Sequence, residues 1–142
     1  MNRDESVSIE EVPREECLAL LASFTVGRIA LALPDGAVIV LPVNYVLDGE
    51  VIVFRSDPGE KMSALHARPA SFQIDWIDPF HRTGWSVLVR GKAFLVTDAE
   101  VAHLALEPWT GDKHHWVKVV PEAITGRRLR AADMPLDTRG YL

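Results

Sequence analysis

Apolar residues in this chain occur in short runs separated by turn residues, and the first run has a helical character. Pro13 suits the first turn of a helix, and Glu15 and Glu16 suit the positive end of its dipole. The apolar residues that follow extend to about Ala22. We therefore predict a helix from Pro13 to about Ala22, preceded by a polar, flexible segment over residues 1–12.

Beyond this helix the apolar runs become short and rich in residues that favour strands. Asp35-Gly36 and Asp48-Gly49 lie between consecutive runs, and Asp-Gly is among the strongest hairpin signals because glycine adopts positive φ at little cost. The first three runs are therefore expected to pair as an antiparallel meander, and Pro121-Glu122 is expected to join the last two. The predicted strands are Val26–Leu33, Val38–Leu47, Val51–Arg55, Ser71–Trp76, Trp85–Thr97, His114–Val120 and Ile124–Leu129.

Short helices are expected between some of these strands. Gly59–Ala67 has the composition of one, and Thr97-Asp98 is a capping signal for another that carries Val101 and Leu104 on one face. Several closely spaced strands with two or three short helices are typical of a mainly β fold, a closed or nearly closed β-barrel, with a β-sandwich as the alternative. Because 48% of the 142 residues are hydrophobic, we expect residues 13–142 to form a single domain with its own core.

The run Val38–Leu47 is apolar at almost every position, which an antiparallel strand shows only when both of its faces are covered. One face can fill a barrel, and a helix or a second subunit must cover the other. Pro42 interrupts the run and removes a backbone donor, so it predicts an edge or a bulge. Asn44 shares a face with Pro42 by the two-residue period of a strand. Its amide needs partners there, which the imide groups of a flat heterocycle or the local backbone would supply.

The charge balance argues against some classes of partner. The chain has 15 Lys and Arg against 20 Asp and Glu, a net charge of −5, so long-range attraction to nucleic acid or to an anionic membrane is not expected. We interpret the four tryptophans as anchors of the core and of a dimer interface rather than as a stacking surface for nucleic acid. Any anion that binds must therefore be held by a local pocket.

The N-terminus lacks the basic-then-apolar order of a secretory signal, and no apolar run approaches the roughly 20 residues that cross a bilayer. We therefore expect a cytoplasmic protein. The single cysteine, Cys17, cannot form an intramolecular disulfide and is expected in the core. The adjacent His114 and His115 are expected on opposite faces of a strand, so we predict no metal site there.

An arginine and a lysine stand on either side of a Pro-Gly corner. Arg55 ends an apolar run, and Pro58-Gly59 turns the chain into the predicted helix, whose first turn carries Lys61. Backbone N–H groups at a helix start and the hydroxyl of Ser56 make a suitable seat for a phosphate. Glu60 competes for the same N–H groups. The alternative interpretation is that these charges are solvated surface residues.

Short motifs along the chain form a specific pattern through their order and spacing, although none is decisive alone. They are Val26-Gly-Arg-Ile-Ala, Leu41-Pro-Val-Asn-Tyr, Val53-Phe-Arg-Ser, Gly59-Glu-Lys, Phe72-Gln-Ile-Asp, Gly84-Trp-Ser-Val-Leu-Val-Arg-Gly, His115-Trp-Val-Lys-Val and Thr125-Gly-Arg-Arg-Leu. From about Glu16 to Arg128 the chain resembles the flavin-binding split-barrel proteins related to pyridoxamine 5′-phosphate oxidase, in particular their small bacterial branch.

The resemblance implies a six-stranded antiparallel split β-barrel that forms a homodimer, with flavin mononucleotide (FMN) in each of two clefts between the subunits. In such proteins the strand matching Val43, Asn44 and Tyr45 lies along the isoalloxazine ring. The position matching Ser86 can reach the cofactor. An aromatic residue of the partner subunit often flanks the ring, and Trp116 is the candidate for it here.

Residues matching Arg55, Ser56 and Lys61 hold the ribityl phosphate in this family. The oxidase itself has a second basic residue just before the phosphate lysine, where this chain has Glu60. The C-terminal basic segment that binds pyridoxal phosphate in the oxidase is also not recognisable here. These departures argue against pyridoxamine phosphate as the substrate and leave flavin binding as the expectation.

The activity that the resemblance implies is hydride transfer to or from a small-molecule substrate, through a flavin at the dimer interface. Two alternatives stay open. One is a flavin-binding or storage protein without turnover, and the other is a reductase that uses the deazaflavin F420. No residue is assigned as catalytic, because the sequence shows no nucleophile with a positioned base.

Overall fold

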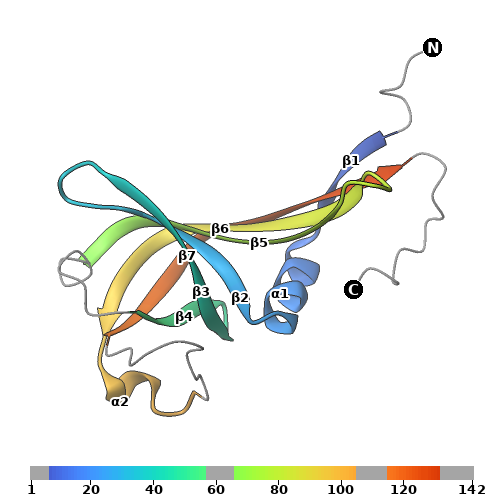
Figure 1. The fold of residues 1–142 in the computed structure, drawn as a ribbon. Helices are drawn as coiled ribbons and strands as arrows, with labels where there is room; N and C mark the ends of the chain where they lie inside the picture. Colours follow the sequence, from blue (N-terminus) through green and yellow to red (C-terminus); the bar gives the residue numbers. More distant parts are fainter. Residues whose placement is uncertain (1–6, 57–65, 105–114, 132–142) are drawn as a thin grey trace.

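The fold is known from a computed structural model that describes residues 7–56, 66–104 and 115–131. Its elements are β1 (Val7–Val12), α1 (Arg14–Ser23), β2 (Val26–Ala32), β3 (Val38–Asp48), β4 (Val51–Ser56), β5 (His66–Asp78), β6 (Thr83–Val96), α2 (Asp98–Val101) and β7 (His115–Ala131). The strands pair in the order β1-β7-β4-β3-β2-β5-β6, and every pairing is antiparallel. A further pairing between β6 and β7 closes the sheet on itself (Figure 1).

Closure through β6 and β7 makes β2 to β7 a barrel, which confirms the predicted mainly β barrel and excludes the sandwich. The predicted meander of β2, β3 and β4 is confirmed as well. In the described part of the chain the sheet has seven strands rather than six, because β1 pairs with β7 outside the barrel. β5, β6 and β7 continue past the barrel as a long arm, and β1 lies along this arm (Figure 1).

The prediction of a flexible N-terminal segment was wrong for residues 7–12, which form β1. Val12 is 5% exposed, and Glu10 forms an ion pair with Arg130 at 3.3 Å. An edge strand buries few side chains, so its composition can be as polar as that of a loop. Helix α1 follows directly, beginning at Arg14 after Pro13 as predicted.

The two strands predicted at the C-terminal end of the chain are in fact one strand, β7, which continues through Pro121-Glu122. The sheet accommodates the proline at a register shift, where Ala123 pairs with Arg90 but Pro121 pairs with Gly91. A Cβ atom on Gly91 would lie 1.9 Å from the carbonyl oxygen of Val120, so the two backbones approach too closely for a side chain. The proline therefore marks a bulge rather than a turn.

The short helices were predicted in part. Thr97 caps α2 as expected: its hydroxyl accepts a hydrogen bond from the Glu100 N–H at 3.3 Å, and its own N–H donates to the Glu100 carboxylate at 2.7 Å. The helix predicted over Gly59–Ala67 lies mostly outside the described residues, and its last two residues belong to β5 instead. No helix in the described ranges is long and apolar enough to cross a membrane.

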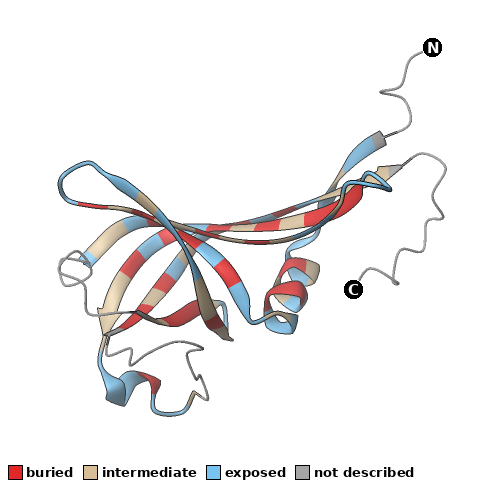
Figure 2. Ribbon diagram, in the orientation of Figure 1, coloured by how far each residue is buried: buried red, intermediate tan, exposed pale blue. Residues whose placement is uncertain are grey.

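The core lies inside the barrel and beneath α1, where buried residues of the strands meet those of the helix (Figure 2). Helix α1 contributes Leu20, Leu21 and Cys17, so the cysteine is buried as expected. Tyr45 is 1% exposed, and its ring meets that of Phe72 edge-on with the centroids 4.7 Å apart. The inner face of β3 therefore belongs to the core.

Candidate functional site

The predicted phosphate arginine lies on the outer face of the barrel, against an aromatic ring. Strands β4 and β7 pair so that Arg55 is directly opposite Trp116. The guanidinium carbon lies 5.0 Å from the centre of the indole ring, which is a cation–π arrangement. Trp116 is 9% exposed because it packs with Val53 of β4 and Val101 of α2. The ring therefore restricts the orientation of Arg55 at the end of β4.

The register of β3 and β4 predicts that Asn44 is next to Arg55 on the same face. The β3–β4 pairing begins with Tyr45 opposite Phe54, and continuing this register by one residue places Asn44 next to Arg55. Directly opposite residues of antiparallel strands project to the same side of the sheet. Asn44, Arg55 and Trp116 thus form a row across β3, β4 and β7, which we call the outer row.

Part of β3 extends beyond the end of β4. Within the described ranges β4 pairs only with residues 45–48 of β3, whereas β2 pairs with residues 38–44. Pro42 lies in this extended part, where the described residues show a partner only on the β2 side, in agreement with the predicted edge or bulge. The extended part of β3 begins at the outer row, so a planar group seated there would lie along the strand backbone.

The neighbours of Asn44 on β3 face the interior of the barrel. The hydroxyl of Tyr45 donates a hydrogen bond to the backbone oxygen of Leu21 at 2.6 Å, and burial raises the pKa of Tyr45 well above its usual value. Val43 packs against the core opposite Gly27. The side chains of Val43 and Tyr45 therefore build the barrel and leave only their backbone to contact a ligand.

Ser86 also faces outward, but at a different place on the barrel. It lies on β6 between Asp75 of β5 and Arg127 of β7. Three strand-to-strand steps separate it from Asn44, about 14 Å at the usual strand spacing. It lines a cavity of about 210 Å³ together with Arg127 and Ile77. Within one chain the structure does not bring Ser86 to the outer row.

The remaining predicted phosphate residues follow Arg55 along the chain. Ser56 ends β4 opposite His115, so its backbone adjoins the outer row. Lys61 lies outside the described residues, and its role stays a prediction. The role of Trp116 beside a partner subunit's flavin also stays a prediction; in this chain its ring contacts Arg55.

Sequence reasoning missed an ion pair near the outer row. Arg28 of β2 pairs with Pro42 of β3, and its Nη1 atom lies 3.6 Å from Oδ2 of Asp75. The Arg28 side chain is 57% exposed, so part of its guanidinium is accessible. The only signal was the motif Val26-Gly-Arg, which carries no information on what the arginine contacts.

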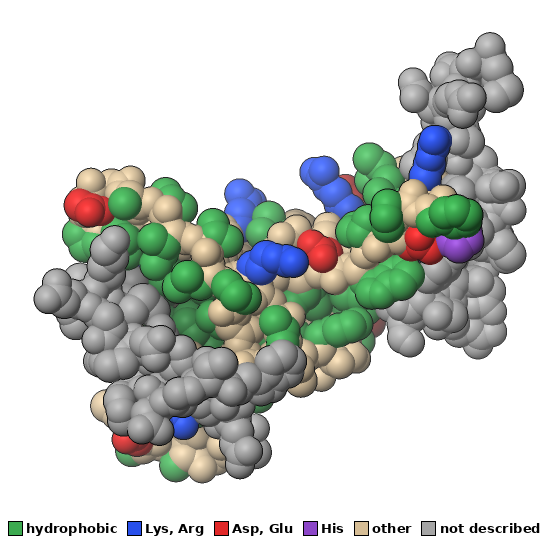
Figure 3. Space-filling model, viewed as in Figure 1, with side chains coloured by type: hydrophobic (Ala, Val, Ile, Leu, Met, Phe, Trp, Pro, Cys, Tyr) green, Lys and Arg blue, Asp and Glu red, His purple; other side chains and the backbone are tan. Residues whose placement is uncertain are grey.

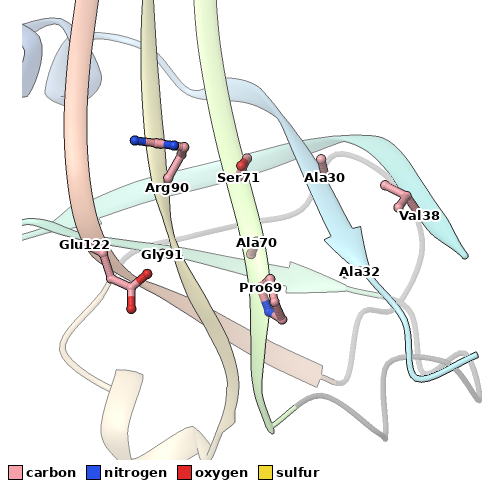
Figure 4. A pocket seen from close by; sticks show the side chains of 9 residues that line it. All are labelled: Ala30, Ala32, Val38, Pro69, Ala70, Ser71, Arg90, Gly91 and Glu122. Carbon is pink, nitrogen blue, oxygen red and sulfur yellow. The ribbon is translucent and has the colours of Figure 1, made fainter. Parts of the chain in front are cut away.

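Pockets of about 330 Å³ open on the outer surface at two places. One lies over β2, β5 and β6, where small side chains line it and Arg90 and Glu122 stand at its margin (Figure 4). The other lies between β4, β7 and α2 and includes Lys118. Neither pocket is lined by a residue that the sequence analysis assigned to cofactor binding. The second pocket adjoins the outer row, because Lys118 is two residues from Trp116 on β7.

The sequence also matches known proteins, and these matches identify the family of the chain. A family model described as pyridoxamine 5′-phosphate oxidase matches residues 13–128. The chain belongs to this family. The match confirms the resemblance found in the sequence. Among curated relatives, an uncharacterized protein of Mycobacterium tuberculosis is 36% identical over 136 residues, covering 87% of each chain.

Solved structures of similar proteins share the fold. A candidate pyridoxamine 5′-phosphate oxidase from Corynebacterium glutamicum gives a TM-score of 0.73 at 29% identity, over 85% of this chain and 98% of that one. An FAD binding protein from Mycobacterium smegmatis gives a TM-score of 0.68 at 36% identity, over 84% of this chain and 98% of that one. One of the solved structures with this architecture is thus that of an FAD binding protein.

Proposed function

We propose that this protein binds a flavin nucleotide at the outer row, with a phosphate beside Arg55 and the ring system beside Asn44. The observation that carries the proposal is the arrangement of a guanidinium, an oriented indole and an amide on three neighbouring strands. Arginine binds phosphate through paired, charge-assisted hydrogen bonds. An asparagine amide both donates and accepts, as the imide edge of a flavin requires.

The residues present fit such a ligand. With a net charge of −5, the protein attracts an anion only through a local cation, and Arg55 supplies one on a strand end where Trp116 orients it. The extended part of β3 supports a flat ring along its backbone. Bound flavin supplies the hydride chemistry, and the residues of this chain bind and orient it.

We further propose that two copies of the chain form the binding cleft. Val38 and Val40 are 66% and 62% exposed on the outer face of β3, and Figure 3 shows hydrophobic side chains grouped over this end of the barrel. A strand that is apolar on both faces is stable when both faces are buried. A second copy of the chain can bury the outer face of β3 without the need for a different protein. The flavin ring and a small-molecule substrate would then share the cleft between the subunits.

A titration of the purified, flavin-free protein tests the binding proposal. FMN, FAD and F420 are added separately while flavin absorbance and fluorescence are followed. We expect a flavin nucleotide to bind and Arg55→Ala to weaken binding about tenfold or more, because a hydrogen bond to a charged group contributes about 1.5–3 kcal/mol. The matched control is Lys92→Ala, which removes a cation that lies 3.9 Å from Glu122 on the surface. Equal affinity of the two variants would contradict the phosphate site, and tight binding of F420 alone would favour the deazaflavin alternative.

Turnover is tested separately from binding. The holoprotein is mixed with NADH, NADPH or reduced F420, and bleaching of the flavin is compared with that of free flavin at the same concentration. Faster bleaching in the protein supports an oxidoreductase. Bleaching no faster than that of free flavin with all three reductants supports the storage alternative.

A further inference from the structure

An arginine lies beside the part of β3 on which the flavin ring is proposed to rest. Arg28 of β2 is directly opposite Pro42, at the strand spacing of about 4.8 Å. Exposure alternates along β2, and Arg28 is one of its outward residues. Its side chain therefore shares the outer face with Pro42 and Asn44. Within β2 and residues 38–44 of β3, Arg28 is the only charged residue.

An acid compensates the charge of Arg28 only in part. Nη1 of Arg28 lies 3.6 Å from Oδ2 of Asp75, which is longer than an ordinary hydrogen bond. The Arg28 side chain is 57% exposed, so its guanidinium is accessible from the outer face. Asp75 lies on β5, which is one strand farther from β3 than β2 is. A ring that lies along β3 would therefore experience more of the positive charge than of the negative one.

We infer that Arg28 stabilises the reduced state of the bound flavin and that Asp75 limits this effect. The inference rests on the proposed flavin site at Arg55 and Asn44. Transfer of a hydride, two electrons and one proton, from a reduced nicotinamide leaves an oxidised nicotinamide and turns the neutral ring system of the flavin into an anion. A cation beside the ring stabilises this anion more than the neutral ring.

The reduction potential of the bound flavin measures this difference directly. A protein shifts such an equilibrium only as far as it binds one state more tightly than the other. The potential therefore reports the ratio of the affinities for reduced and oxidised flavin, whether or not the protein turns over a substrate. Exposed ion pairs contribute little to folding, so substitutions of Arg28 and Asp75 should leave the fold intact.

The experiment is a reductive titration of the full-length holoprotein and its variants, with a reference dye of known potential. Arg28→Gln should make the potential about 30 mV more negative, a tenfold change in the affinity ratio for a two-electron couple. Asp75→Asn should shift the potential in the opposite direction, because it removes the acid and leaves the cation. Arg28→Lys keeps the charge and should restore most of the potential.

Arg90→Gln is the matched control. Arg90 is an exposed arginine on β6, and β2 and β5 separate β6 from β3, which places it about 14 Å away at the usual strand spacing. The same loss of charge there should change the potential much less. The shift caused by Arg28→Gln should also shrink at about 1 M salt, where charges are screened beyond about 3 Å.

Two results would overturn the inference and leave the flavin site at Arg55 standing. One is a bound flavin whose potential changes in neither Arg28→Gln nor Asp75→Asn. The other is a shift of the same sign in both variants, because a general change in the site, rather than charge, would then be the cause. Failure of any flavin to bind would overturn the proposed function and this inference together.

Discussion

At the scale of single residues, β3 divides its side chains between the barrel and the proposed site. Tyr45 and Val43 face inward and fill the core. Asn44 between them faces outward, on the side where the continued β3–β4 register leads to Arg55. A strand gives alternate residues to opposite faces, so one segment can build the fold and present a ligand surface at the same time. A substitution on one face should therefore affect stability, and one on the other should affect binding.

Tyr45→Phe tests this division. The hydroxyl of Tyr45 donates to the Leu21 carbonyl inside the protein, and removing it takes a hydrogen bond from a buried acceptor. We expect a loss of about 1–3 kcal/mol in the free energy of unfolding, measured by urea denaturation, with flavin affinity unchanged. A variant of normal stability that binds flavin poorly would show instead that the hydroxyl contacts the ligand.

At the scale of elements, β1 and α1 act together as a cover for the arm of the sheet. Val12 at the end of β1 is buried, and the Cys17 thiol of α1 contacts the Val12 carbonyl oxygen at 3.6 Å. A Cβ on Gly126 of β7 would lie 2.6 Å from the Cys17 sulfur, so strand and helix approach β7 very closely. Although β1 is polar in composition, it therefore covers the part of the core that lies between α1 and β7.

Removal of residues 1–12 should therefore destabilise the protein. The deletion takes away β1 and uncovers the first turn of α1, so we expect a lower melting temperature and faster reaction of Cys17 with a thiol reagent, since burial is what protects it. Deletion of residues 1–6 alone spares β1 and serves as the control. If the two deletions melt alike and Cys17 stays equally protected, β1 makes no contribution to the core.

The elements also show what a single sequence can predict. Helix α1 and strands β2 to β4 were predicted to within one or two residues, because Pro13 and the Asp-Gly turns mark their ends. β1 was missed because a polar edge strand lacks the apolar alternation of a buried one. β7 was predicted as two strands because Pro121 is typical of a turn. In the structure Pro121 instead pairs with Gly91 of β6 at a bulge, and the strand continues.

At the scale of the whole molecule, the outer surface of the barrel has an apolar part and a charged part. Val38 and Val40 lie exposed on β3, and the outer row and its adjoining pocket lie further along the same face. An apolar patch next to a ligand site is a common feature of subunit interfaces. We therefore expect dimerisation and flavin binding to depend on each other.

Val40→Lys tests this dependence. A cation on the apolar face of β3 should shift the protein from dimer to monomer in light scattering at micromolar concentration, because a buried unpaired charge is costly. Flavin affinity should fall with it. The control is Phe80→Lys, which makes the same change at an 87% exposed turn residue. A stable monomer for the unmodified chain, or a dimer that Val40→Lys leaves intact, would contradict this interface.

The sequence predicted residues of the candidate site, but it did not predict how these residues are arranged in space. Arg55 was identified from its position before a Pro-Gly corner, and Asn44 from its polarity within an apolar run. The register between β4 and β7 was needed to show that Trp116 lies against Arg55 of the same chain. Lys118 and Arg28 lie within sequence motifs, but the motifs do not show what these two side chains contact, because their neighbours come from distant strands.

The crystal structure of the protein soaked with FAD tests the central claim most directly. We predict that a flavin phosphate lies within hydrogen-bond distance of the Arg55 guanidinium, with the isoalloxazine ring along β3 beside Asn44. A complex in which Arg55 contacts no phosphate, or in which the flavin lies at another face of the barrel, would contradict the account.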